Sequence, residues 1–217
     1  MDGGFSTYKN RMKLLSSLNS EKIVNIDGWV QSHFCVSSFA YFLMTEIGKF
    51  DKLVMTNLEQ FLLNHLKQEG LKSYWWTKDY YALYYILKGS INIRNKTISN
   101  LVEVIIEKEL NKKSKINNYF SGYIIRIICS SDKLFKKYSD LVIKSVNNLV
   151  RHQFSDGSWD HGFSLKIPHP NVLNPNLSRL NYIKASSGTN ILVNDFSRIF
   201  SSTSVLSALL DYERRLS

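Results

Sequence analysis

The stretch Gln153-Phe154-Ser155-Asp156-Gly157-Ser158-Trp159 decides the fold prediction, because it sets a glutamine, a turn glycine and a tryptophan at fixed spacing. Glycine tolerates the positive φ angle of a tight turn. A glutamine amide can accept a hydrogen bond from one helix end and donate one to the next, and the indole ring can cover the junction. The motif therefore predicts a tight corner between two packed helices.

Acidic-glycine pairs of the same kind recur along the chain, at Asp27-Gly28, Glu69-Gly70 and Asp156-Gly157. The glycines stand at positions 28, 70 and 157, so the intervals are 42 and 87 residues, and the second is close to twice the first. A further turn is expected near position 113, in the polar stretch 111–118, which has no glycine. A fixed period of this size is typical of stacked helix pairs.

Two kinds of helix alternate between these turns. Four apolar helices with aromatic starts are predicted for an inner layer, over Trp29 to Met44, Tyr74 to Leu87, Tyr119 to Cys129, and Phe200 to Tyr212. Three amphipathic helices are predicted for an outer layer, over Lys49 to Lys67, Ile98 to Leu110, and Leu134 to His152. HEAT and armadillo arrays share such a period, but the aromatic inner helices argue against them.

Composition favours one folded domain over residues 1–217, since 44% of the residues are hydrophobic and 13% aromatic. All three prolines lie in a Pro-, Asn- and Ser-rich segment at about 164–194, which is predicted to be a long irregular loop. No strand pattern stands out. The net charge of +10 suits contact with phosphates, but the lysines look like a solvated surface, so nucleic acid is not the expected partner.

The motif at 153–159 resembles the QW motif of squalene-hopene cyclase and its relatives in the terpenoid cyclase and prenyltransferase superfamily. Gln68-Glu-Gly70 with the tryptophans that follow is a looser copy, and Asp2-Gly-Gly-Phe-Ser-Thr-Tyr8 is similar to the aromatic turn of these proteins. The run 194–203 is similar to the start of an inner helix. The resemblance implies an all-α, α/α toroid whose inner helices line an aromatic cavity for isoprenoid chains.

The chain departs from this family in two respects. A closed ring takes about six helix pairs, whereas four to five are counted, so we expect an open or incomplete toroid, completed by a second copy or a partner chain. The Asp-x-Asp-Asp motif of class II cyclases, which protonates an alkene, is absent, as is the Asp-rich motif that holds Mg²⁺ in class I synthases. Whether the chain is an enzyme therefore stays open. If it is one, the resemblance implies a cyclase-like isomerase or lyase.

Asp79 is the best candidate for a catalytic acid, because neighbouring aromatic residues can desolvate its carboxyl group and stabilise a cation. The alternative is a carboxylate that favours a helix N-terminus. His33, Cys35 and Asp27 are residue types found in the zinc site of protein prenyltransferases. Positions i and i+2 of a helix do not face each other, however, and we expect neither a metal site nor a cofactor.

The leading hypothesis is a toroid domain that binds an isoprenoid or another long apolar chain. Its alternative is a non-catalytic accessory or interaction module that keeps the fold without the acid. Six aromatic residues are predicted to line the cavity, although each could equally be core: Trp29, Trp75, Trp76, Tyr80, Tyr81 and Phe200. We expect a cytoplasmic protein, because no apolar run is long enough to span a bilayer, and peripheral membrane contact stays open.

Overall fold

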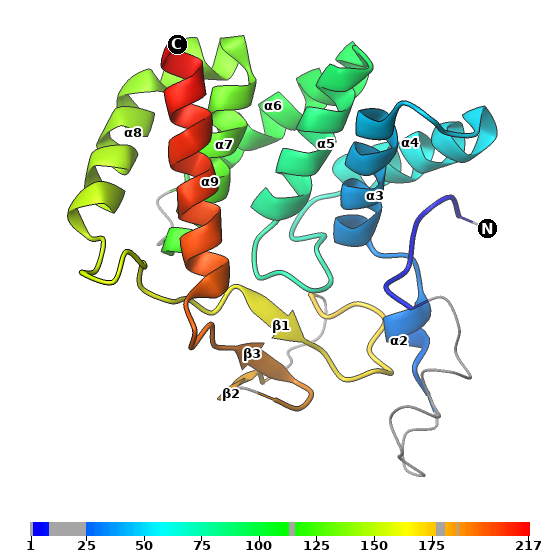
Figure 1. Ribbon diagram of the computed structural model, residues 1–217. Coiled ribbons are helices and arrows are strands. Elements are labelled where there is room, and N and C mark those ends of the chain that lie inside the picture. The colour runs from blue at the N-terminus through cyan, green and yellow to red at the C-terminus, as the bar shows by residue number, and fades with distance from the viewer. Residues whose placement is uncertain (1, 9–24, 113–115, 177–180, 186) are drawn as a thin grey trace.

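Helices dominate the computed structural model (Figure 1), which describes residues 2–8, 25–112, 116–176, 181–185 and 187–217. Residues 113–115 of the predicted turn at 111–118 lie outside the described residues. The helices are α2 (Asp27–Val30), α3 (Phe34–Ile47), α4 (Lys52–Leu66), α5 (Tyr80–Asn92), α6 (Lys96–Leu110), α7 (Asn118–Ser130), α8 (Asp132–Arg151) and α9 (Ile199–Leu216). The strands are β1 (Leu165–Ile167), β2 (Ile183–Ala185) and β3 (Ile191–Val193).

The long helices form two layers, as the repeat predicted. In the inner layer α3 packs on α5, α5 on α7, and α7 on α9. The outer helices α4, α6 and α8 each pack on the inner helix that precedes them in the chain. Figure 1 shows α3 and α9 at the two edges of this row. The all-α toroid of repeated helix pairs is confirmed, with three pairs followed by α9 in the described part of the chain.

Side chains at the starts of the helices explain where most of them begin. The Asp51 carboxylate accepts hydrogen bonds from the first backbone N–H groups of α4. Asn95, Asn117 and Ser131 do the same for α6, α7 and α8. Such caps satisfy N–H groups that have no partner within the helix. The outer helices therefore begin within three residues of their predicted starts.

Two inner helices begin later than predicted. The helix expected from Trp29 is broken after α2, because His33 donates its backbone N–H to the Phe5 carbonyl and Ser32 pairs with Ser6. The helix expected from Tyr74 begins only at Tyr80. Residues 75–77 instead pair with the segment 164–166, through N–H···O bonds of 2.8 and 2.9 Å. In both places, pairing with a distant segment replaces the first helical turns.

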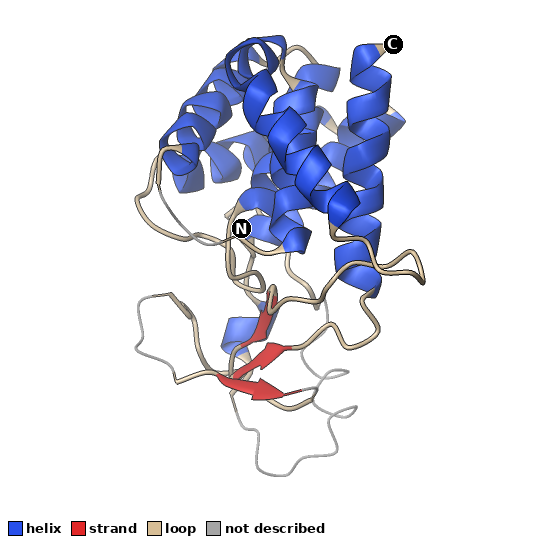
Figure 2. Ribbon diagram, turned by 90° about the vertical axis from the view of Figure 1, so that its left-hand side faces the viewer, coloured by secondary structure: helices blue, strands red, loops and turns tan. Residues whose placement is uncertain are grey.

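The predicted absence of strands is wrong. Strand β3 pairs antiparallel with β1 and parallel with β2, so the spatial order is β1-β3-β2. Each strand has only three residues, which is too short for an alternating pattern to show. This small sheet lies below the helices rather than among them (Figure 2), so part of the segment 164–194 is ordered as strands.

The QW-like corner packs through its glycine and tryptophan. Gly157 has φ +81°, as the turn requires. The Trp159 ring is 2% exposed, and its Nε1–H donates to the Leu149 carbonyl at the end of α8 (2.7 Å). The backbone N–H of Trp159 donates to the Ser202 hydroxyl on α9 (3.1 Å). Gln153, in contrast, is exposed and reaches only the Gly157 carbonyl, so its predicted bridge between two helix ends is wrong.

Both cysteines, Cys35 and Cys129, are free and buried. Within the described ranges, no helix combines the length and the hydropathy that crossing a bilayer demands.

Candidate functional site

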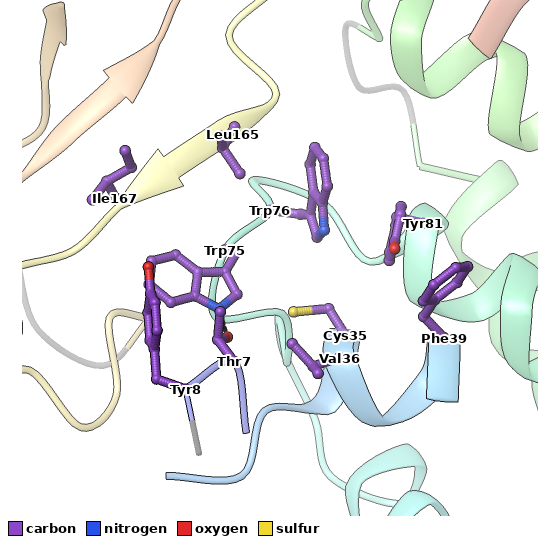
Figure 3. A pocket seen from close by; sticks show the side chains of 10 residues that line it. All are labelled: Thr7, Tyr8, Cys35, Val36, Phe39, Trp75, Trp76, Tyr81, Leu165 and Ile167. Carbon is purple, nitrogen blue, oxygen red and sulfur yellow. Dashed lines mark hydrogen bonds between the residues drawn. The ribbon is translucent and has the colours of Figure 1, made fainter. Parts of the chain in front are cut away.

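An apolar pocket of about 380 Å³ lies where the inner helices begin (Figure 3). Its walls come from five segments: the N-terminal segment, the first turns of α3, the loop before α5, the start of α5, and β1. The lining residues are Thr7, Tyr8, Cys35, Val36, Phe39, Trp75, Trp76, Tyr81, Leu165 and Ile167. None of these side chains is an acid or a base that is charged at neutral pH. The pocket is thus suited to an apolar ligand.

Trp75 is held in the pocket wall by hydrogen bonds to two other segments. Its indole N–H donates to the Thr7 hydroxyl (2.8 Å) and approaches Nδ1 of His33 (3.3 Å). Nε2 of His33 lies 2.8 Å from the Gly28 carbonyl, which can only accept. His33 therefore carries its proton on Nε2, and its Nδ1 is an acceptor for Thr7 and Trp75.

This arrangement requires a neutral imidazole. His33 is 2% exposed, and burial lowers its pKa to about 4, against a smaller opposing effect of the Gly28 carbonyl. A proton on Nδ1 would leave the Trp75 N–H and the Thr7 hydroxyl without this acceptor. The neutral ring fixes the positions of Thr7 and Trp75 in the pocket.

Trp76 forms the opposite side of the pocket by stacking between two tyrosines. Its ring centroid is 4.8 Å from that of Tyr81, with 24° between the planes, and 5.1 Å from that of Tyr119, with 14°. The backbone of Trp76 forms a bridge with Leu165 of β1. Trp76 therefore joins the sheet, α5 and α7 at one point, and its ring has little freedom to move.

The strand β1 separates the pocket from a buried lysine. Leu165 and Ile167 line the pocket. Lys166, between them, is 3% exposed, and its Nζ donates to the Asn176 side-chain oxygen (2.5 Å). Burial lowers the pKa of Lys166 to about 8, because a charged ammonium group is poorly solvated there. The alternation along β1 thus keeps this lysine out of the pocket.

Further aromatic residues continue from the pocket along the inner helices. We call the group Phe39, Phe42, Tyr81, Tyr85, Tyr119 and Tyr123 the aromatic cluster. Tyr85 contacts Phe39 and Phe42 at centroid distances of 4.8 and 5.3 Å. Tyr81 contacts Tyr85 at 4.9 Å. Burial raises the pKa of Tyr81, Tyr119 and Tyr123, so these phenols are neutral at physiological pH.

The structure brings three of the six predicted ligand residues together, namely Trp75, Trp76 and Tyr81. Trp29 lies behind Trp75, with 5.9 Å between centroids, and donates its indole N–H to the Pro168 carbonyl. Tyr80 is 2% exposed and packs in the core, whereas Phe200 is 50% exposed, beside a narrow cleft at the start of α9. Trp29, Tyr80 and Phe200 therefore do not line this pocket. Ligand contact by any of the six predicted residues stays a prediction.

Asp79 lies outside the pocket, and its side chain binds the loop before α5. Its carboxylate accepts backbone N–H groups of Lys72 (3.0 and 3.2 Å) and Ser73 (2.8 Å). It also occupies the N-cap position of α5. This geometry fits the alternative of a carboxylate at a helix N-terminus better than that of an acid facing a ligand, and the catalytic role stays a prediction.

The sequence interpretation missed the pocket residues that come from the N-terminal segment, α3 and β1. Thr7 and Tyr8 belong to the aromatic turn at 2–8, which was noted only as a resemblance. Leu165 and Ile167 were assigned to an irregular loop. Their alternation around Lys166 was the available signal, but three residues are too few to distinguish it from chance.

Among the described residues, no group of three or more His, Cys, Asp or Glu side chains is placed to hold a metal ion. His33 and Cys35 were considered for zinc. Both ring nitrogens of His33 are engaged in the hydrogen bonds described above.

No protein-family model matches the sequence, and no curated protein matches it. Solved structures do share its fold. The type II terpene cyclase MstE from Scytonema is 18% identical, with a TM-score of 0.79, over 99% of this chain and 64% of that one. A protein from Actinoplanes is 16% identical, with a TM-score of 0.81, over 98% and 65%.

A further structure holds an MstE variant with geranylgeranyl dihydroxybenzoate as substrate, at 18% identity and a TM-score of 0.79, over 99% and 64% of the two chains. The protein thus has the fold of a terpenoid cyclase-like α/α toroid. The chain spans less than two thirds of the length of these structures.

Proposed function

We propose that this toroid domain binds an isoprenoid or a similar long apolar chain in the pocket of Figure 3. The observation that carries the proposal is the lining, in which Trp75, Trp76 and Tyr81 meet aliphatic side chains without a charged group. Fixed aromatic faces suit the many weakly polar C–H and π groups of a prenyl chain. The complexes of MstE with a geranylgeranyl substrate and with its product support it through the shared fold.

A filled pocket is expected to lose this binding. Val36 lines the pocket, so Val36→Phe takes up part of its volume of about 380 Å³. We expect geranylgeraniol to bind the wild-type protein saturably in isothermal titration calorimetry, and to bind Val36→Phe at least roughly tenfold more weakly. Val150→Phe is the matched control, because it makes the same chemical change at an exposed position on α8.

Equal affinity of the wild-type protein and Val36→Phe would contradict the proposal, provided that circular dichroism shows both to be folded. Trp76→Ala gives a second measure, since it removes the ring stacked between two tyrosines without filling the space. Weaker binding by both variants, with opposite changes in pocket volume, places the ligand in this pocket.

Catalysis is a separate question, because no carboxylic acid is among the residues that line the pocket. Protonation of an alkene needs a strong, desolvated acid, which the lining side chains do not offer. Incubation with farnesyl and geranylgeranyl substrates distinguishes the two functions. A cyclised product would establish a cyclase of non-standard mechanism, and unchanged substrate with saturable binding would support the accessory module.

We also propose that a second copy of the chain covers the open edge at α9. Ile199, Leu206 and Leu210 lie on one face of this helix and are 63%, 54% and 44% exposed. In the other pairs an outer helix covers the inner one. Light scattering is expected to give twice the mass of one chain, and Leu206→Glu to give the single mass. A single mass for the wild-type protein at high concentration would contradict this.

A further inference from the structure

The apolar pocket wall contains two hydrogen-bond donors that the protein itself leaves unused. Trp76 and Tyr81 both line the pocket, and their rings stack on each other at a centroid distance of 4.8 Å. Within the described ranges, neither the Trp76 indole N–H nor the Tyr81 hydroxyl has a hydrogen-bond partner. Trp75, in contrast, donates its indole N–H to Thr7 (2.8 Å), and the Thr7 hydroxyl lies 3.0 Å from Nδ1 of His33. The two unused donors thus lie together, on the side of the pocket that Trp76 forms.

The two donors border the part of the pocket where Cys35 lies. Figure 3 shows the indole nitrogen of Trp76 on the edge of the ring that faces Cys35. Burial raises the pKa of the Tyr81 hydroxyl, and Tyr85 and the Cys35 thiol raise it further, so this hydroxyl is neutral and the thiol is near it. The other phenol in the lining, Tyr8, is 37% exposed and stays in contact with water. Trp76 and Tyr81 are therefore the donors that a bound ligand covers.

A hydrocarbon laid over these two rings would remove water from both donors and offer no acceptor in return. A buried donor without an acceptor costs free energy, so a site with such donors discriminates against ligands that cannot bind them. A carbonyl oxygen has two lone pairs and can accept from both donors at once. A carboxylate or a phosphate also accepts, but the lining has no cation to replace the water that an anion loses. The donors thus favour a neutral acceptor.

Resting on the proposed function, we infer that Trp76 and Tyr81 select isoprenoids that carry a neutral carbonyl oxygen, as a ketone or an aldehyde, on the apolar chain. The oxygen accepts from the Trp76 N–H and the Tyr81 hydroxyl, while the hydrocarbon part contacts Leu165 and Ile167. Both donors are then specificity-determining. Tyr119 stacks on Trp76 at 5.1 Å, in addition to Tyr81, so the position of the indole is fixed before a ligand binds.

The test compares three ligands that differ at one carbon: farnesylacetone, which is a ketone, its secondary alcohol, and the hydrocarbon with CH₂ in place of C=O. In isothermal titration calorimetry, we expect the wild-type protein to bind the ketone roughly tenfold more tightly than the hydrocarbon. Tyr81→Phe removes one donor and keeps the ring, so it is expected to lower this ratio to roughly threefold. Combining it with Trp76→Phe is expected to abolish the ratio.

The alcohol separates a carbonyl from other neutral oxygens. We expect it to bind more weakly than the ketone, because its own O–H also needs an acceptor. Infrared spectra of the isotope-labelled ketone give a readout that a merely structural role would not change. Hydrogen bonding lowers the carbonyl stretching frequency, and Tyr81→Phe is expected to reduce this shift. An alcohol that binds as tightly as the ketone would overturn the assignment to a carbonyl.

Tyr138→Phe is the matched control, because it removes a phenol hydroxyl from the outer helix α8 and is expected to keep the ratio. If the double variant fails to fold, Tyr81→Phe alone decides the matter. Equal affinity of the wild-type protein for ketone and hydrocarbon, or an unchanged ratio in Tyr81→Phe, would overturn this inference and leave isoprenoid binding standing. Absence of binding by all three ligands would instead overturn the proposed function.

Discussion

Trp159→Ala is expected to lower the free energy of unfolding by roughly 3 to 5 kcal/mol, the usual effect of removing a buried aromatic ring. The ring is buried, and its N–H donates to the Leu149 carbonyl at the end of α8. The substitution leaves a cavity at the corner between α8 and α9 and a carbonyl without this donor. Urea denaturation followed by circular dichroism gives the difference in free energy.

Gln153→Ala is the matched control for this corner. The Gln153 side chain is exposed, and its amide reaches only the Gly157 carbonyl within the same turn (2.9 Å). We expect a loss of about 0.5 kcal/mol or less, as for most surface substitutions. Equal losses for the two variants would show that the corner depends on the glutamine and that the role assigned to Trp159 is wrong.

His33 is expected to make the protein strongly sensitive to acid. Its pKa is about 4 in the folded protein, against 6.5 for an unperturbed histidine. Between these values the unfolded chain binds the proton and the folded chain does not, so stability falls as the pH falls from 6.5 to 4. A shift of this size corresponds to roughly 3 kcal/mol. At neutral pH this contribution is fully present.

Denaturation curves at several pH values from 7 to 4 measure this effect. Carboxylates also titrate in this range, so the quantity to compare is the difference between wild type and His33→Gln, which lacks the imidazole. The variant is expected to have a shallower slope. His152→Gln, which removes an exposed imidazole at the end of α8, is the matched control for the loss of a histidine. Parallel curves for wild type and His33→Gln would refute the buried, neutral His33.

The helical layers were predictable because their signals are local. Apolar residues recur at helical spacing in the outer helices, and residues such as Asp51 and Ser131 stand at their starts as caps. Gly157 and Trp159 marked a corner that the structure contains. Each of these features depends on residues a few positions apart.

The pocket was only partly predictable because its walls depend on pairing between distant segments. Trp75 and Trp76 were recognised from aromatic content, but the helix expected around them does not form, because Lys166 N–H binds the Trp75 carbonyl instead. Trp29 and Tyr80 are also aromatic residues at the starts of predicted inner helices. Their side chains are nevertheless buried away from the pocket. Side-chain direction at the helix starts depends on these long-range bonds, which no local pattern encodes.

The N-terminal segment has a consequence for how strongly any ligand is held. Thr7 and Tyr8 are held at the pocket by contacts with other segments, among them the Phe5–His33 and Phe5–Ser37 hydrogen bonds, the Ser6–Ser32 bridge and the bonds of Thr7 to His33 and Trp75. A segment that docks through such bonds can open locally while the rest of a protein stays folded. Only the fraction of molecules in which this segment is docked has a complete pocket wall. The apparent dissociation constant of a ligand is therefore the intrinsic constant divided by that fraction.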